Sequence, residues 1–513
     1  MVYVSVVIPV HNGAEHLRET LDSVRGQTFS DFEVFCIDDG STDSTPQILE
    51  DYCAADPRFS FISIPNSGAG PSRNVGLERA SGKYLYFLDA DDLLVPHALE
   101  NAVRAADDFT SDVVLFKYQR FDSATGRVTK TIRPNELPNM TIDRAVDKSQ
   151  ESNIFQLSSP APWNKLFSRQ FIFDLGIKFQ NLPRVNDLFF GWSAIAAATR
   201  IVLLDEVLIH YRSFQSDSLS LRQTRTPLAI TEALLATHRF LIEQGLYSKE
   251  VEQSFVNEAV SNYSVNLANI ETETAYENLF KVGQEQLFPE LRVFEFPTEY
   301  FDLPETALFV DHMRKTKHHR DFAFLRVKNI HSECAQLTME IAGIHKESNQ
   351  LDSHLAKLWR SPSFMIEQGP RAVARKLKAS LRGQPRKPSA PQLTDPDLHD
   401  FNKILSDANS FSDFETQFMQ LRAARLNQLS HLETQSTWPK DDAFLKHVEK
   451  IMNSSPFDYL LFRQISGRIN RRKLRRMKDS LSNSMNARRK QLVDSKTFQR
   501  WVKAGKARIP QGY

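Results

Sequence analysis

Residues 84–95, YLYFLDADDLLV, are the stretch from which the fold and the candidate site can be worked out. Residues of strand type run directly into Asp89, Asp91 and Asp92, so three carboxylates stand at the C-terminal end of a predicted strand. Open α/β sheets bind their ligands at that end of their strands. Such closely spaced acids repel one another unless a cation offsets their charge, and hard divalent cations prefer carboxylate oxygen. The ordinary alternative to a metal site is that Asp91 or Asp92 is the N-cap of a helix with Pro96 near its first turn.

The segments around this stretch alternate between predicted strands and helices. Residues 4–10 are almost uniformly apolar, as in a strand that is buried on both faces of a parallel sheet. Strands are predicted at residues 4–10, 32–37, 59–64, 84–87, 112–118 and 202–209, and helices at 14–24, 44–53, after the loop 65–71, in the later part of 160–173, and at 186–198. This alternation predicts an α/β fold with a right-handed, doubly wound sheet.

Polar residues follow each of the first four predicted strands. They are His11 and Asn12, Asp38 and Asp39, Ser67 and Arg73, and Asp89 and Asp91. Because parallel strands end at the same edge of a sheet, we expect these side chains to form one site. The turn after the first strand, VHNG, lacks the GxGxxG pattern, and the chain has no Walker lysine, which argues against a dinucleotide cradle or a P-loop.

Composition gives weaker indications. The 513 residues carry a formal net charge of +1, so the overall charge points to no partner. The chain has three cysteines without metal-ligand spacing, which is typical of reduced thiols in a cytoplasmic protein. The longest apolar region, residues 189–209, is interrupted by charged residues, so we expect any membrane role to be peripheral.

The ordered motifs resemble those of a known family. Residues 4–45, which contain VIPVHN and IDDGSTDST, and residues 68–92, GAGPSRNVGLERASGKYLYFLDADD, resemble the nucleotide-binding half of the family 2 glycosyltransferases, which have the GT-A fold. The segments PWNKLF, NDLFF, HYR and SLS, which follow in order, resemble the acceptor half of the same family. The resemblance covers roughly residues 1–221.

The resemblance implies a nucleotide-sugar donor that residues of the nucleotide-binding half contact. Asp39 would accept a hydrogen bond from the nucleobase of a UDP-sugar or related donor. Pro9 and His11 would line the base and ribose pocket, and Arg73 would face the donor. His11 stands where an aromatic residue is common in the family.

The resemblance also assigns the reacting groups. Asp91 would coordinate a divalent metal, Mn²⁺ or Mg²⁺, while Asp89 would contact the ribose or the metal, with Asp92 in support. Asp187 would be the catalytic base, whereas a first-turn acid favoured by the helix dipole is the structural alternative. Arg212 and Ser218 would hold the diphosphate.

These expectations define an inverting transferase that moves a sugar to a hydroxyl of a glycan or lipid-linked acceptor in cell-surface polysaccharide synthesis. A single base without a second nucleophilic carboxylate favours one displacement. The residue before the base is usually Glu in the family, and here it is Asn186. A non-catalytic sugar-nucleotide-binding module is the alternative function, and a nucleotidyltransferase is disfavoured because VHNGAEHL is neither glycine-rich nor basic.

The C-terminal half divides into further predicted regions after a GT-A domain at residues 1–225. Residues 226–320 are helical in pattern, 321–360 form a heptad helix, 361–394 a linker, and 395–513 a basic helical region. Apolar residues three and four apart form the heptad seam: Val327, Ile330, Cys334, Leu337, Ile341, Ile344, Leu351, Leu355 and Leu358. Such a seam makes either a coiled-coil homodimer or a long helix that packs on its own domain.

The last fifty residues are strongly basic. The basic residues include Arg468, Arg471, Arg472, Lys473, Arg475, Arg476, Lys478, Arg488, Arg489 and Lys490. A basic amphipathic helix can lie on an anionic membrane surface, and a solvated helix is the ordinary alternative. Nucleic acid is not expected as a partner, because no base-reading motif accompanies the charge.

Overall fold

The chain forms two compact units, Met1–Lys315 and Thr316–Tyr513. The computed structural model describes residues 2–122, 127–132, 145–146, 153–157, 159–213, 223–359 and 403–421, and short segments between 457 and 486. Ser218 and the predicted linker 361–394 lie outside the described residues, as does most of the basic region.

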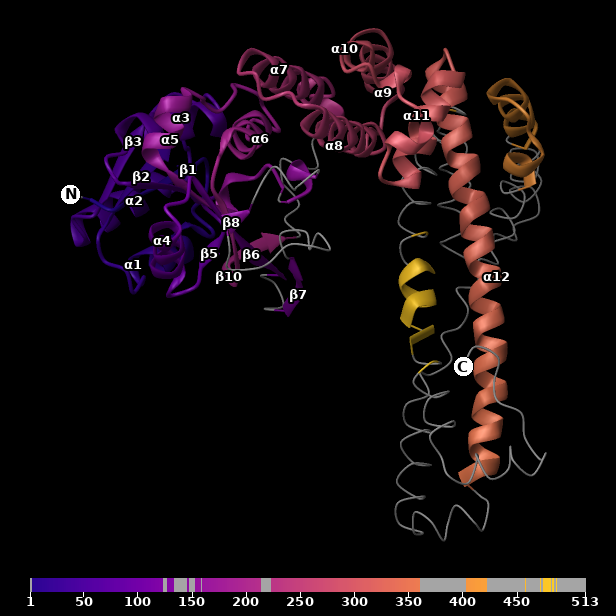
Figure 1. The fold of residues 1–513 in the computed structure, drawn as a ribbon, viewed down its shortest axis with the longest axis horizontal. Helices are drawn as coiled ribbons and strands as arrows, with labels where there is room; N and C mark the ends of the chain where they lie inside the picture. Colours follow the sequence, from indigo (N-terminus) through magenta and orange to yellow (C-terminus); the bar gives the residue numbers. More distant parts are fainter. Residues whose placement is uncertain are drawn as a thin grey trace, which may run out of the picture. The chain divides into compact units, whose positions relative to one another are not determined.

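The first unit is built on a ten-stranded mixed sheet (Figure 1). The strand order is β3-β2-β1-β4-β9-β6-β10-β5, with β7 paired to β6 and β8 to β10. The strands are β1 (Val4–Val10), β2 (Phe32–Asp38), β3 (Phe59–Ser63), β4 (Tyr84–Phe87), β5 (Leu93–Leu94), β6 (Val113–Asp122), β7 (Arg127–Ile132), β8 (Ala145–Val146), β9 (Lys165–Ser168) and β10 (Ile201–Ser213). Strand β1 runs parallel to β2 and β4, and β2 runs parallel to β3, so the carboxyl ends of these four strands share one edge. The expected α/β class is confirmed.

Strand β9 corrects the sequence-based expectation. Residues 160–173 were expected to be a loop and a helix, but Lys165–Ser168 form a strand before the helix α5 (Arg169–Leu175) begins. This strand is antiparallel to β4 and β6 and lies between them, so the sheet is mixed and not purely parallel. A four-residue strand held only by distant partners has too little local periodicity to be recognised.

Helices cover both faces of the sheet. Helices α1 (Leu17–Arg25), α2 (Thr45–Ala55) and α4 (Ala98–Asp108) pack on the face of β1 that carries Val4, Val6, Ile8 and Val10. Helix α3 (Ala69–Arg79) packs on the opposite face, where a Cβ at Gly76 would collide with Val7. Figure 1 shows α3 and α5 on one side of the strands and α1 and α4 on the other. The loops that follow β1, β2 and β4 are thereby fixed between two layers of helices.

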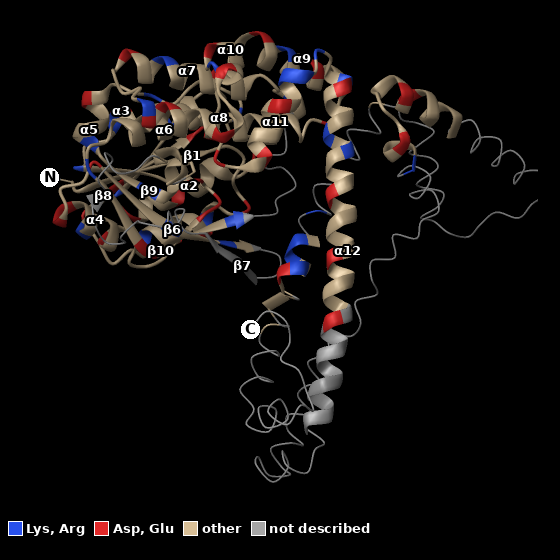
Figure 2. Cartoon of the chain, turned by 45° about the vertical axis from the view of Figure 1, so that its right-hand side comes forward, with Lys and Arg blue, Asp and Glu red and all other residues tan. Residues whose placement is uncertain are grey.

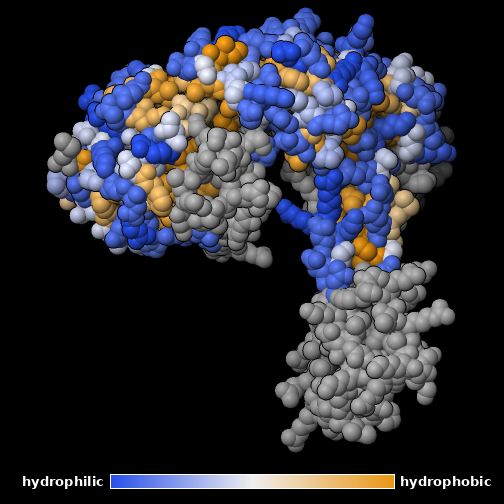
Figure 3. Space-filling view, viewed as in Figure 1, coloured by the Kyte–Doolittle hydropathy of each residue, from blue (hydrophilic) through white to orange (hydrophobic). Residues whose placement is uncertain are grey.

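A helical region follows the sheet within the same unit, as the sequence predicted. Helices α7 (Ala229–Glu243), α8 (Lys249–Leu267), α9 (Glu273–Val282), α10 (Phe288–Glu290) and α11 (Pro304–Lys315) form it. Helix α6 (Leu188–Ala197) precedes β10 in the chain and packs against α7. On the face of this unit drawn in Figure 3, hydrophobic residues are interspersed among hydrophilic ones. Among the described residues, no helix combines the length and the apolar character needed to cross a bilayer.

The second unit contains the long helix α12 (His319–Trp359), which spans the predicted heptad region. Leu337 and Ile341 of its seam pack against Leu474 of the same chain. Acidic residues lie along α12 (Figure 2), and Glu333 forms ion pairs with Arg471 and Arg475. This part of the seam is therefore covered within the chain, and a homodimer through α12 stays a prediction.

Candidate functional site

Asp39 organises the loop that follows β3. It is buried, and its carboxylate accepts hydrogen bonds from the backbone N–H of Ser67 at 2.7 Å and of Gly68 at 2.8 Å. Gly68 has a φ of +96°, a conformation open to glycine and costly for other residues. A carboxylate has further lone pairs, so Asp39 can still accept from a ligand. Its expected contact with the nucleobase stays a prediction.

His11 lies next to Asp39 at the end of β1. The side chain of His11 is exposed, and its Nδ1–H donates to the backbone oxygen of Asp39 at 2.8 Å. The amide nitrogen of Asn66 lies 3.2 Å from the same ring. Pro9 is buried in β1 opposite Ile37. The structure thus places His11 against Asp39 and Pro9 in the strand that leads to them, and their expected role in a base and ribose pocket stays a prediction.

Arg73 links the acidic stretch to the residue before the predicted base. Its Nη2 donates to Oδ1 of Asp89 at 2.6 Å, and its Nη1 donates to Oδ1 of Asn186 at 2.9 Å. The guanidinium is buried, with its carbon 5.4 Å from the centre of the Phe179 ring. Asp89 keeps 31% of its side chain exposed, so it can contact a ligand while it pairs with Arg73.

Arg212 fixes the acidic stretch from the other side. Its backbone N–H donates to Oδ1 of the fully buried Asp92 at 2.8 Å, and its Nε donates to the backbone oxygen of Asp91 at 2.7 Å. Its Nη2 donates to Oε2 of Glu19 at 2.7 Å. Burial, and then the nearby Asp91 and Asp89, raise the pKa of Asp92 well above its usual range. Arg212 therefore holds the acidic turn in place, and its contact with a diphosphate stays a prediction.

Asp187 lies at the N-terminus of α6, and its side chain does not cap that helix. Burial raises the pKa of its carboxyl group, and the negative charge of Asp89 raises it further. The positive charges of Arg73 and Lys165 oppose this rise. A carboxylate with a raised pKa is a stronger base, which suits proton abstraction from an acceptor hydroxyl.

Lys165 is a site residue that the sequence analysis missed. It is fully buried, and its Nζ donates to the backbone oxygens of Ser159 at 2.7 Å and Ala161 at 2.6 Å, and to Oδ1 of Asn164 at 2.8 Å. Burial lowers the pKa of Lys165 to about 7. The sequence offered no signal for it, because the strand β9 that carries Lys165 was itself not recognised.

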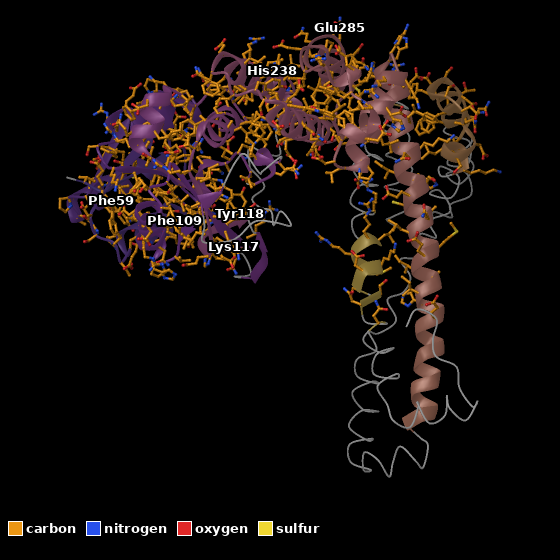
Figure 4. All side chains as sticks on the ribbon, viewed as in Figure 1. Phe59, Phe109, Lys117, Tyr118, His238 and Glu285 are labelled. Carbon is orange, nitrogen blue, oxygen red and sulfur yellow. The ribbon has the colours of Figure 1, made fainter. Side chains whose placement is uncertain are left out.

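Aromatic side chains lie close to the acidic stretch. The Trp163 ring stacks on Tyr211 with a centroid distance of 5.0 Å, and Tyr118 meets Trp163 edge-on at 4.6 Å. Tyr118 and its neighbour Lys117, both labelled in Figure 4, come from β6, and Lys117 pairs with Asp205 of β10. Burial, and then Asp92, raise the pKa of Tyr211. These rings pack against one another close to the acidic residues.

The acidic residues after β4 suit a metal ion whose coordination is completed by a bound ligand. Asp89 and Asp91 are both partly exposed. One carboxylate oxygen of the buried Asp92, Oδ2, has no hydrogen-bond partner. Within the described part of the chain, no three side chains of His, Cys, Asp or Glu form a ready metal cluster. A cation here would take some of its oxygens from a phosphate ligand, as Mg²⁺ commonly does.

Comparison with known proteins places this chain among the glycosyltransferases. Residues 5–165 match the family model described as Glycosyl transferase family 2. A protein of Bacillus subtilis named "Putative glycosyltransferase EpsH" is 29% identical over 292 residues, which are 56% of this chain and 81% of that protein. The glycosyltransferase GlyA of Streptococcus pneumoniae is 25% identical over 371 residues, 68% of this chain and 53% of that protein. The match with GlyA thus covers about half of its length.

A solved structure shares the fold. The Staphylococcus aureus TarS fragment 1–349 in complex with UDP-GlcNAc aligns with a TM-score of 0.50 at 22% identity, over 61% of this chain and 87% of that one. TarS is named as a poly(ribitol-phosphate) β-N-acetylglucosaminyltransferase, and its sequence is 31% identical over 216 residues, 41% of this chain and 35% of TarS. The alignment shows that the N-terminal unit has the GT-A architecture.

Proposed function

The chain belongs to the family 2 glycosyltransferases through its N-terminal GT-A domain, and we propose that it moves a sugar from a nucleotide-diphosphate sugar to a hydroxyl of a glycan or lipid-linked acceptor. The observation that carries this proposal is the pairing of Arg73 with Asp89 and with Asn186, the residue before Asp187. The positive charge of Arg73 also acts on the carboxyl group of Asp187, so the expected base and the expected metal-side acid share one cation.

We assign the role of general base to Asp187. It takes the proton from the acceptor hydroxyl as the oxygen attacks the anomeric carbon, and the sugar–phosphate bond breaks on the opposite face. A single displacement of this kind inverts the anomeric centre. The raised pKa of Asp187 and its freedom from helix capping support this role.

The leaving diphosphate is the second requirement. Asp91, with Asp89 beside it, would hold a divalent cation, which offsets the negative charge of the leaving group when it is bound. Arg212 orients this acidic turn through the backbone oxygen of Asp91. The buried Asp92 anchors the backbone of Arg212 in return.

We propose a uridine diphosphate sugar as the donor class. Asp39 and His11 lie at the ends of β2 and β1, where the base and ribose of a nucleotide would sit in this fold. The solved TarS fragment of the same architecture holds UDP-GlcNAc. The acceptor that we propose is a cell-surface glycan or its lipid-linked precursor, and the relative TarS is named for transfer to poly(ribitol phosphate).

A thermal-shift titration tests the proposal. The full chain is titrated with UDP-, GDP- and dTDP-sugars, each with Mn²⁺ and with EDTA. Binding to the folded state stabilises it by about 2.7 kcal/mol at 100 times Kd. We expect a shift with UDP-sugars that EDTA abolishes. A cooperative unfolding transition that no nucleotide moves would contradict the proposal.

A further inference from the structure

Val185 has an unusual backbone conformation two residues before Asp187. Its φ is +52°, in the left-handed region. That region is unfavourable for a β-branched residue, because its Cβ crowds the backbone. Strained residues of this kind persist only where their surroundings hold them, and they cluster at functional sites.

Local hydrogen bonds close the segment 180–187, which we call the base loop. The backbone N–H of Gln180 donates to the oxygen of Asn186 at 3.1 Å, and the side-chain amide of Asn186 donates to the oxygen of Leu182 at 3.3 Å. Arg73 of α3 donates a hydrogen bond to the side-chain oxygen of the same Asn186. Asn186 stands where the family usually has Glu, and its side-chain amide both accepts the hydrogen bond from Arg73 and donates one to Leu182, which a carboxylate could not do.

Arg184 ties the base loop to the helical region. The side chain is 6% exposed, and its Nη2 donates to Oδ1 of Asn266 in α8 at 2.6 Å. Among the described residues no carboxylate pairs with Arg184, and its Nε has no hydrogen-bond partner. Asn266 is in the last turn of α8, where the negative end of the helix dipole favours a cation. Burial of a cation with so few partners costs free energy, so its hydrogen bond to Asn266 is a contact that the fold depends on at this point.

We infer that Arg184 and Asn266 are positioning residues, through which α8 holds the base loop in its strained form and sets the place of Asp187. This inference rests on the proposed function, in which Asp187 is the base. It gives the helical region a role in catalysis, because without α8 the base loop loses the hydrogen bond between Arg184 and Asn266.

Substitution of Asn266 tests this inference. Asn266→Ala removes the acceptor for Arg184, and we expect kcat to fall by about 10- to 100-fold with little change in donor KM, because a small displacement of a reacting group has effects of this size. Asn266→Asp keeps an acceptor oxygen and should retain most of the activity. Asn262→Ala is the matched control, since that side chain donates to the backbone oxygen of Glu258 in its own helix.

Hydrogen exchange provides a readout that does not depend on activity. We expect faster exchange of the amides of residues 180–188 in Asn266→Ala than in the wild type or Asn262→Ala, with β1 unchanged. Equal exchange and equal kcat in Asn266→Ala and the wild type would overturn the inference. A wild type that transfers no sugar would count against the proposed function alone, because the exchange experiment still decides whether α8 holds the base loop.

Discussion

Replacement of Gly70 by alanine should move the base loop without touching a charged residue. Gly70 lies in the first turn of α3, directly against the base loop. A Cβ at this position would lie well under 3.0 Å from the backbone oxygen of Gln180 and 3.2 Å from Cβ of Asn186. Helix α3 cannot yield easily, because Gly76 is pressed against Val7 of β1. The base loop must therefore give way.

The size of the effect follows from the clash. To restore an ordinary contact, the base loop must retreat by roughly 1 Å, and a misplacement of that size costs about 100-fold in rate. This corresponds to about 2.7 kcal/mol in the barrier. We expect the loss to appear in kcat, because Asp187 follows Asn186 in the loop while Asp39 and the acidic turn stay in place.

Release of the nucleoside diphosphate from the donor in the presence of acceptor is the assay. Gly343→Ala in α12 is the control, since a Cβ at that position meets nothing within 4 Å. The control should be as active as the wild type. A folded Gly70→Ala protein with unchanged kcat would refute the reasoning that the base loop is held tightly against α3.

Other variants separate the remaining roles. Asp91→Ala should weaken donor binding in Mn²⁺ but change it little in EDTA, which calorimetry would detect; equal weakening in both would remove the metal assignment. Lys165→Met should lower the free energy of unfolding by about 1–3 kcal/mol, because it leaves backbone oxygens unpaired. The pKa of Lys165 falls from 10.5 to about 7 on folding, so the unfolded chain binds an extra proton between these pH values. In urea unfolding, the free energy of unfolding of the wild type should therefore rise relative to that of the variant from about pH 7 to about pH 10; a constant difference would contradict the lowered pKa of Lys165.

The parallel part of the fold was predictable because each strand carries its own signal. Residues 4–10 are apolar throughout and end in a polar turn, and the structure has β1 at Val4–Val10. The acids after β4 were recognisable from sequence spacing alone. Strand β9 was missed because its partners, β4 and β6, are distant in sequence.

The interactions that hold the site together were harder to foresee. Arg73 was expected to face the donor, but its hydrogen bonds to Asp89 and Asn186 depend on how α3 and the base loop meet in three dimensions. The buried Lys165 could not be distinguished from a surface lysine by its residue type. No sequence pattern indicates a left-handed valine, since its conformation is imposed by the surrounding contacts.

Sugar transfer by Asp187→Asn, with donor binding measured on the same protein, tests the central claim most directly. Loss of the general base should reduce transfer by roughly 100- to 10,000-fold and leave donor binding largely intact. In the wild type, kcat should fall as the pH drops through the raised pKa of Asp187, because the protonated carboxyl group cannot accept a proton. Wild-type transfer by Asp187→Asn would contradict the assignment of Asp187 as the catalytic base.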